Sequence, residues 1–189
     1  MARFTAFLDS NVLYPAALRN FFMWLTVGGL FRARWSYLVH EEWMAAVQRD
    51  FSDVTTKQLE RTRDLMNLHA EDCLVTGFEK LIERFELPDA NDRHVLAAAV
   101  HSGADVIVTQ NLKDFPEEKL DPYGIEAQHP DTFISLLFDL NAGAVLAAAR
   151  EHRASLKSPS RSVDEYLNTL ERQGLTQTVA ELLEYASVL

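Results

Sequence analysis

The sequence has one cysteine, Cys73, in 189 residues, and only seven glycines. A single cysteine excludes an intrachain disulfide and a zinc centre built from several thiolates. No glycine-rich loop of the kind that cradles phosphates is present, and no Ser-His-Asp set for nucleophilic catalysis is recognisable. Chemistry in this chain therefore has to come from other side chains.

Long apolar runs are also missing. The stretch 21–31, FFMWLTVGGLF, falls short of the roughly 20 residues that a membrane helix needs, and two glycines interrupt it. Asp9 interrupts the apolar run near the amino terminus, which argues against a secretory signal. We therefore expect a cytoplasmic protein with no membrane segment.

Basic residues are too few to balance the acidic ones, with 18 Lys and Arg against 28 Asp and Glu and a net charge of −10. This balance works against a nucleic-acid partner, because phosphate binding is normally driven by basic surface. Two explanations would reconcile the net negative charge with a nucleic-acid partner: some acidic residues are metal ligands, or basic residues gather near the site. The sequence alone does not separate the two.

Short apolar strands alternate with helical patterns over residues 1–140. This alternation predicts an α/β fold, in which an α/β/α domain of three layers surrounds a central parallel sheet. Strands are expected at 3–8, 32–35, 73–75, 105–109 and 124–127, and helices at 15–27, 37–49, 56–68, 77–85, 89–102 and 131–140. Residues 141–189 contain only helical patterns, at 142–154, 162–173 and 176–187, and are expected to form a small all-helical extension.

Acidic and amide side chains follow two of these strands. Asp9, Ser10 and Asn11 follow the first, and Thr109, Asn111 and Asp114 follow the fourth. The carboxyl ends of parallel strands meet at one edge of a sheet, where ligands bind. With Glu42 and Asp92, these carboxylates match the ligands that Mg²⁺ prefers. A metal held there would activate water for hydrolysis of a phosphodiester.

Each residue also has a purely structural interpretation. Asp9 would begin a turn, and Glu42 would be a solvated helical side chain. Asp89 and Asp92 would cap a helix, which is our preferred interpretation for Asp89, whereas for Asp92 we prefer the metal. His94 and His101 lie seven residues apart on the same helix, and without a third ligand they are interpreted as surface or packing residues.

Taken together, the motifs resemble those of PIN-domain nucleases, and more particularly the VapC-like toxins of toxin–antitoxin pairs. The resemblance covers about residues 2–139. The apolar strand ending in Asp9-Ser-Asn11 is similar to the first motif, and the helix carrying Glu41 and Glu42 to the second. Spacing favours Glu42, with Glu41 as the alternative. The segment from Asp92 to Asp114 is similar to the last two motifs.

This resemblance implies an endoribonuclease that depends on Mg²⁺ or Mn²⁺, a small antitoxin that neutralises it, and often a homodimer. Asp9, Glu42, Asp92 and Asp114 would be the catalytic metal ligands, supported by Ser10, Asn11, Thr109 and Asn111, while Arg93 and Lys113 would contact RNA phosphates. Asn111 stands where many family members carry Asp. Two other functions stay open: a catalytically silent PIN-fold binding module, and a metal-dependent phosphatase.

Overall fold

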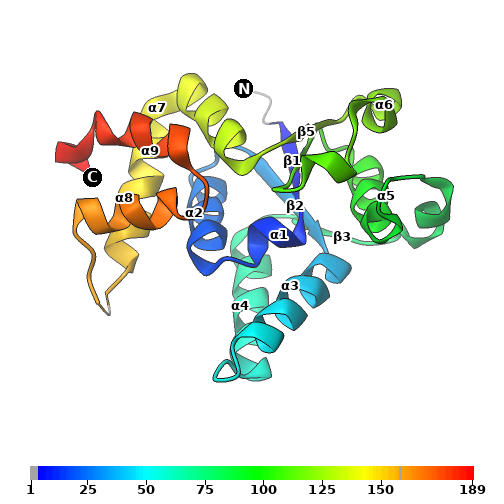
Figure 1. Ribbon diagram of the computed structural model, residues 1–189, viewed down its shortest axis with the longest axis horizontal. Helices are drawn as coiled ribbons and strands as arrows, with labels where there is room; N and C mark the ends of the chain where they lie inside the picture. The colour runs from blue at the N-terminus through cyan, green and yellow to red at the C-terminus, as the bar shows by residue number, and fades with distance from the viewer. Residues whose placement is uncertain (1–3, 158) are drawn as a thin grey trace. The chain divides into compact units, whose positions relative to one another are not determined.

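A computed structural model describes residues 4–157 and 159–189 and contains a five-stranded sheet (Figure 1). The strand order is β3-β2-β1-β4-β5, and every neighbouring pair is parallel. The strands are β1 (Thr5–Leu8), β2 (Arg32–Ser36), β3 (Leu74–Val75), β4 (Val106–Val108) and β5 (Glu126–Gln128). The expected parallel sheet is confirmed.

The pairing of β1 with β4 positions the candidate site. Chain order reverses between these two strands, because β2 and β3 lie on one side of β1 while β4 and β5 lie on the other. Leu8 pairs with Val108 at the carboxyl ends of the two strands. Asp9 and Thr109 therefore follow neighbouring strands at a topological switch point, where open α/β sheets bind ligands.

Helices link the strands and complete the expected α/β fold. The α-helices that accompany the sheet are α1 (Ser10–Leu13), α3 (Tyr37–Asp50), α4 (Thr56–His69), α5 (Arg93–Ser102) and α6 (Glu117–Leu120). The same part of the structure contains the 3₁₀ helices η1 (Glu79–Arg84), η2 (Ala90–Asp92), η3 (Leu112–Asp114) and η4 (Asp121–Tyr123). Helix α5 packs against β1, β2 and β4, so it covers the strands that bear the candidate site.

Local capping signals set several helix ends as expected. Ser36 accepts a hydrogen bond from the Val39 amide at the start of α3, and Gly103 ends α5 in the left-handed region with φ 63°. Such a φ suits glycine, which has no Cβ to clash. These contacts fix the ends of the two helices that carry Glu42 and Asp92.

Some expected elements differ in type. Residues 77–85 were expected to be a helix, but the structure has the 3₁₀ helix η1. The helix expected over 89–102 is divided into η2 and α5. Arg3, the expected start of the first strand, lies outside the described residues. Short α and 3₁₀ turns are similar locally, and sequence patterns separate them poorly.

A buried polar network holds the start of α3. Oδ1 of Asn67 accepts from Nε1 of Trp35 at 2.8 Å and lies 3.0 Å from Nε2 of His40. Nε1 of Trp43 donates to Nδ1 of His40 at 2.9 Å. Because an indole nitrogen only donates, Nδ1 of His40 accepts and Nε2 carries the hydrogen that bonds to Asn67. The network thereby fixes the helix that carries Glu42.

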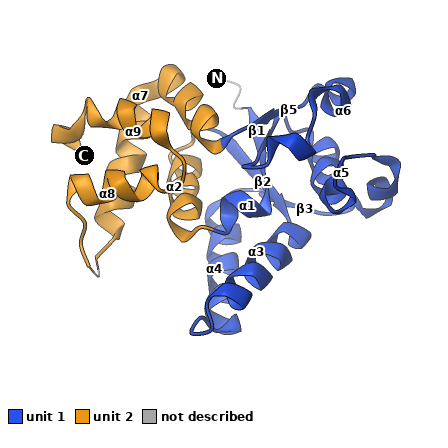
Figure 2. Ribbon diagram, viewed as in Figure 1, with its two compact units in different colours: residues 1–14, 31–129 blue, residues 15–30, 130–189 orange. Residues whose placement is uncertain are grey.

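The chain divides into two compact units (Figure 2). Unit 1 contains residues 1–14 and 31–129, and unit 2 contains residues 15–30 and 130–189. The expected division at residue 140 differs from this grouping, since unit 2 begins earlier and takes in residues 15–30. Residue 140 instead adjoins Asn141, where non-helical φ and ψ angles interrupt α7 (Pro130–Ser155).

Unit 2 is helical within its described residues, apart from an isolated antiparallel β-bridge between Lys157 and Ser160. It consists of α2 (Ala16–Val27), α7, α8 (Val163–Glu171), α9 (Thr176–Leu183) and η5 (Ala186–Val188). Phe21, Phe22 and Leu25 of α2 are fully buried, and Phe22 stacks on Phe133 of α7 with ring centroids 5.8 Å apart. The apolar stretch near residue 21 therefore belongs to the core of this unit.

By length and composition, α7 is apolar enough to cross a membrane, with a mean hydropathy of 1.6 in its most apolar window. Core helices of globular domains pass the same test. Packing of α7 on α2 and α9 accounts for part of this apolar character, because Phe133, Ile134, Leu137 and Val145 are almost completely buried and 44% of that window is buried.

Candidate active site

Asp9 is the centre of a hydrogen-bonded group at the end of β1. Its carboxylate is buried, with the residue 4% exposed. Oδ1 accepts from the Ser10 amide at 2.6 Å, while Oδ2 accepts from Nδ2 of Asn11 at 2.6 Å and from Oγ1 of Thr109 at 2.7 Å. Burial raises the pKa of Asp9, and the bonds from Thr109 and Ser10 oppose that rise.

Asn11 joins the two strand ends. Besides Asp9, its Nδ2 donates to Oγ1 of Thr109 at 2.9 Å, and its Oδ1 accepts from the Gln110 amide at 2.9 Å. Oγ1 of Thr109 also accepts from the Asn111 amide at 3.1 Å. Three of the four residues predicted as supports, Ser10, Asn11 and Thr109, contact Asp9 directly.

Asp92 lies at the junction of η2 and α5, in a field of negative charge. Its pKa is raised to about 7, first by burial and then by the carboxylates of Asp9, Asp89, Asp114 and Glu42. Its side chain does not cap α5, although Asp92 occupies the N-cap position. Asp89 instead accepts from the Asn91 amide at 2.8 Å, as the capping interpretation predicted. The Asp92 carboxylate is thus left for another role.

The structure separates Glu42 from Glu41. Glu42 acts on both Asp9 and Asp92 through its charge, and its Oε1 lies 2.7 Å from Nε2 of His94 on α5. Glu41 lines a different cleft, of about 400 Å³, together with Tyr37 and other residues of α3 and α4. Of the two glutamates, Glu42 is the one that lies with the acidic group.

The loop after β4 brings Asn111 to Asp114. Nδ2 of Asn111 donates a short hydrogen bond to Oδ2 of Asp114. This bond orients the carboxylate that acts on Asp92. The amide at position 111 therefore supports an acidic residue without adding a charge of its own.

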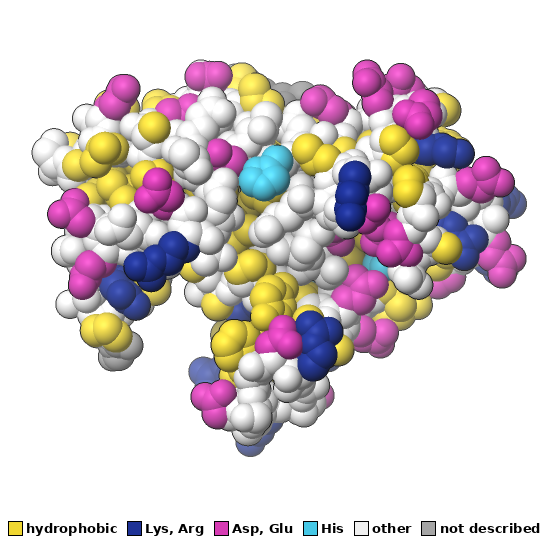
Figure 3. Space-filling model, in the orientation of Figure 1, with side chains coloured by type: hydrophobic (Ala, Val, Ile, Leu, Met, Phe, Trp, Pro, Cys, Tyr) yellow, Lys and Arg dark blue, Asp and Glu magenta, His cyan; other side chains and the backbone are white. Residues whose placement is uncertain are grey.

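The two predicted phosphate contacts differ in their surroundings. Arg93 is half-buried, and its Nε donates to the Ala90 carbonyl at 2.9 Å. Lys113 is exposed in η3, beside Asp114. Figure 3 shows acidic side chains gathered on the face of unit 1 near α5, with basic side chains close by.

These donors fit a hard divalent cation. Asp9, Glu42, Asp92 and Asp114 offer carboxylate oxygens, the ligands that Mg²⁺ and Mn²⁺ prefer. The pKa of Asp92 is raised first by burial and then by repulsion from neighbouring carboxylates, and a cation would relieve that repulsion. Among the described residues, no three His, Cys, Asp or Glu side chains stand close enough to enclose an ion, so a cation would have to draw these groups together.

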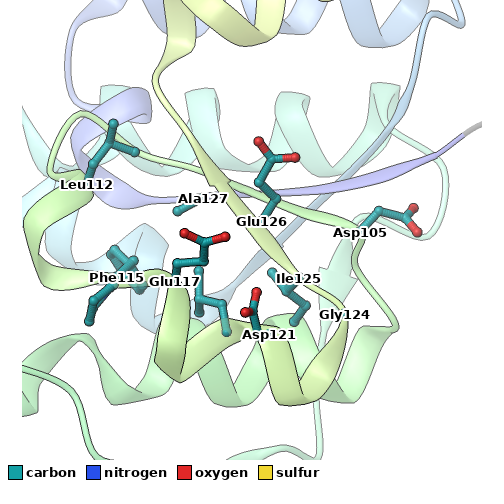
Figure 4. Close-up of a pocket in the computed structure, with 11 residues that line it drawn as sticks. Asp105, Leu112, Phe115, Glu117, Asp121, Gly124, Ile125, Glu126 and Ala127 are labelled. Atoms are coloured by element: carbon teal, nitrogen blue, oxygen red, sulfur yellow. The ribbon is translucent and has the colours of Figure 1, made fainter.

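A second acidic feature on unit 1 is separate from this group. A cleft of about 620 Å³ is lined by carboxylates of Asp105, Glu117, Asp121 and Glu126 above an apolar floor (Figure 4). None of the predicted site residues lines it. Asp105 also has a structural role, because its Oδ2 accepts from the Thr5 amide at 2.7 Å.

Sequence patterns did not assign His94 to the site. It was interpreted as a surface or packing residue, but it is buried and contacts Glu42 across 52 residues of sequence. Its place two residues after Asp92 in the sequence was the available signal. That signal becomes informative only when the contact between His94 of α5 and Glu42 of α3 is known.

Comparisons with known proteins match two parts of the chain. The VapC50 C-terminal domain matches residues 130–184, within unit 2. The Mycobacterium tuberculosis (strain ATCC 25618 / H37Rv) protein named "Putative ribonuclease VapC50" is 57% identical over 56 residues, which are 30% of this chain and 33% of that protein. The match thus spans only a third of that relative's length, and no solved structure matches the chain. The PIN domain matches residues 5–113, more than half of the sequence, and this chain therefore belongs to the PIN-domain family.

Proposed function

We propose that this protein is a Mg²⁺-dependent endoribonuclease and the toxin of a toxin–antitoxin pair. Membership of the PIN-domain family and the similarity to a relative named as a ribonuclease support this function. The observation that carries it is the gathering of the carboxylates of Asp9, Glu42 and Asp114 around Asp92, whose pKa is raised to about 7 by burial and then by these charges. Such a cluster of like charges has little structural benefit without a cation.

In this proposal Asp9, Glu42 and Asp92 hold the metal, and Asp114 helps directly or through water. A bound Mg²⁺ or Mn²⁺ would lower the pKa of a water and offset charge on the phosphodiester. Oδ2 of Asp9 accepts hydrogen bonds of 2.6 and 2.7 Å, whereas the second bond to Oδ1, from the Ser10 hydroxyl, is long at 3.4 Å, so Oδ1 has the greater remaining capacity for a metal. Thr109 and Asn11 hold that carboxylate in one orientation.

The remaining side chains orient groups or bind substrate. Asn111 keeps Asp114 directed through its amide hydrogen bond. Lys113 and Arg93 would meet RNA phosphates, which offsets part of the repulsion expected from a net charge of −10. Bound metal would offset more of it.

The test is cleavage of total RNA by the purified protein, with Mg²⁺ and with a chelator. Asp9→Asn and Asp92→Asn should each lower the cleavage rate at least about 100-fold while circular dichroism shows an intact fold. Cleavage that continues at the wild-type rate in both variants, or in excess chelator, would show that the proposed chemistry is wrong.

Adjacent glutamates on α3 offer a matched control. Glu42→Gln should lose cleavage, whereas Glu41→Gln should retain it, because Glu41 lines the separate cleft. The opposite result would show that Glu41, and not Glu42, is the metal ligand.

The proposed partners are a small antitoxin and a second copy of the chain. The acidic group would accept a basic side chain of the antitoxin, as complementary charge favours. Co-purification with the product of an adjacent small reading frame, and loss of RNA cleavage in that complex, would support the antitoxin. Light scattering would determine whether the chain is a dimer.

Two alternatives are tested by the same preparations. A silent binding module would show no thermal stabilisation by Mn²⁺ or Mg²⁺. A phosphatase would turn over a small phosphate ester faster than RNA.

A further inference from the structure

We propose that His94 is a positioning residue that holds Glu42 ready for the metal; this inference rests on the proposed function. Glu42 is on α3 and His94 is on α5, and their facing atoms, Oε1 and Nε2, are 2.7 Å apart. No predicted role or family match accounts for this contact. Its partners are buried to very different extents, with 9% of the His94 side chain exposed and 42% of the Glu42 side chain.

The hydrogen in this contact belongs to His94. An ionised carboxylate only accepts, so Nε2 of the imidazole must donate. Nδ1 of His94 is buried and has no hydrogen-bond partner among the described residues. An N–H at that position would be left unsatisfied, which favours the tautomer with its hydrogen on Nε2. His94 therefore presents one donor, directed at Glu42.

The physical benefit lies in the freedom of Glu42. A glutamate side chain that is 42% exposed samples many rotamers, and ordering it upon metal binding costs entropy. A bond from an imidazole fixed by the packing of α5 restricts those rotamers in advance. One carboxylate oxygen is then held by His94, and Oε2 is left for the cation. Such second-layer hydrogen bonds typically change metal affinity 10- to 100-fold.

A histidine at this position has no evident packing benefit. The adjoining Val95, Leu96 and Ala97 are almost fully buried apolar residues. Burying an imidazole with one nitrogen unpaired is unfavourable compared with burying an aliphatic side chain. The contact with Glu42 explains why a donor stands there.

The experiment measures Mn²⁺ affinity by calorimetry in the full chain. His94 is replaced either by glutamine or by asparagine, whose amide side chain is shorter. In His94→Gln the amide nitrogen takes the place of Nε2 and still reaches Glu42. In His94→Asn it takes the place of Nδ1 and does not. We expect His94→Asn to weaken Mn²⁺ binding 10- to 100-fold and His94→Gln to stay close to wild type. His101→Asn, on the exposed part of the same helix, should leave binding unchanged.

A second measurement separates positioning from a general effect on folding. In a Glu42→Gln background, His94→Asn should weaken Mn²⁺ binding no further, because the group it positions is already lost. Equal affinity in His94→Asn and wild type, equal losses in the Asn and Gln variants, or a full additional loss in the double variant would each overturn the inference. Those outcomes leave the proposed nuclease intact. Absence of Mn²⁺ binding by the wild-type chain would instead overturn the nuclease proposal and this role together.

Discussion

Oγ1 of Thr109 donates a hydrogen bond of 2.7 Å to Oδ2 of Asp9, although the two residues are 100 positions apart in the sequence. The bond spans the carboxyl ends of β1 and β4, the strands at which chain order reverses. The same hydroxyl accepts from Asn11 and from the Asn111 amide, so all of its hydrogen-bonding capacity is used. The first prediction concerns this hydroxyl.

Thr109→Val should lower the rate of metal-dependent RNA cleavage about 10- to 100-fold, because Asp9 loses the donor that orients its carboxylate. Thr109→Ser keeps the hydroxyl and should retain most of the activity. Cleavage rates at saturating Mg²⁺ provide the comparison. Equal rates in the Val and Ser variants would show that the hydroxyl has no part in positioning Asp9.

Asp92→Asn should stabilise the metal-free protein at pH 7.5 while removing its activity. The folded-state pKa of Asp92 is about 7, above the ordinary value of 3.8. Between these values the folded chain holds a proton that the unfolded chain has lost, so stability falls as pH rises through this window. The amide introduced by the substitution does not ionise, so the variant avoids this loss of stability. The gain in the free energy of unfolding should be only about 1 kcal/mol, because water screens the charges around the half-buried side chain. Urea unfolding at pH 5 and pH 7.5 measures the change, and a variant less stable than wild type at pH 7.5 would contradict it.

His152 should make unit 2 sensitive to acid. It is 1% exposed, lies 3.2 Å from the Tyr166 hydroxyl and stacks on Phe21, and burial lowers its pKa to about 4 from 6.5. The unfolded chain binds the extra proton between these values, so stability is full above pH 6.5 and falls as pH decreases toward 4. The loss is about 3 kcal/mol at most.

His152→Phe removes the titrating group and keeps a ring against Phe21. Its free energy of unfolding should be lower than wild type at pH 7, since the buried Tyr166 hydroxyl loses a partner, but should change less between pH 7 and pH 4.5. Equal changes in both proteins over that range would show that His152 is not the source of the acid sensitivity.

Asp131 on α7 caps the start of α9. Its carboxylate accepts from the amides of Gln177 and Thr178, both at 2.9 Å, and from the Thr178 hydroxyl at 2.8 Å. Leu175, the N-cap residue of α9, provides no side-chain cap. Asp131→Ala should therefore lower the free energy of unfolding by about 2 kcal/mol.

Asp139→Ala is the matched control, since it removes an exposed carboxylate from the same helix. Its effect should stay within about 0.5 kcal/mol. Chemical denaturation of the full chain measures both variants. Equal free energies of unfolding for the Asp131→Ala and Asp139→Ala variants would show that Asp131 does not stabilise the protein by capping α9.

Much of the site was predictable because strand ends and polar residues coincide. Two short apolar runs, each followed by acidic and amide residues, were enough to place Asp9 and Thr109 at one edge of a parallel sheet. Capping residues such as Ser36 fixed the start of α3 in the same way. Local sequence determines these features, which explains why they could be predicted.

The features that sequence patterns missed depend on packing between elements. Spacing favoured Glu42 and left Glu41 as the alternative, because the rotation of α3, which distinguishes the two, cannot be read from adjacent residues in one helix. The contact of His94 with Glu42 requires the approach of α5 to α3. Residues 15–30 group with residues 130–189 because apolar side chains of α2 pack on α7, a relationship with no local signal. Asp131 caps α9 from 46 residues away for the same reason.

The most direct measurement is a crystal structure of the chain soaked in Mn²⁺, with the ion located by its anomalous scattering. The account predicts a peak within bonding distance, about 2.1 Å, of carboxylate oxygens of Asp9 and Asp92. No peak there, or a peak only in the separate cleft lined by Asp105, Glu117, Asp121 and Glu126, would contradict it.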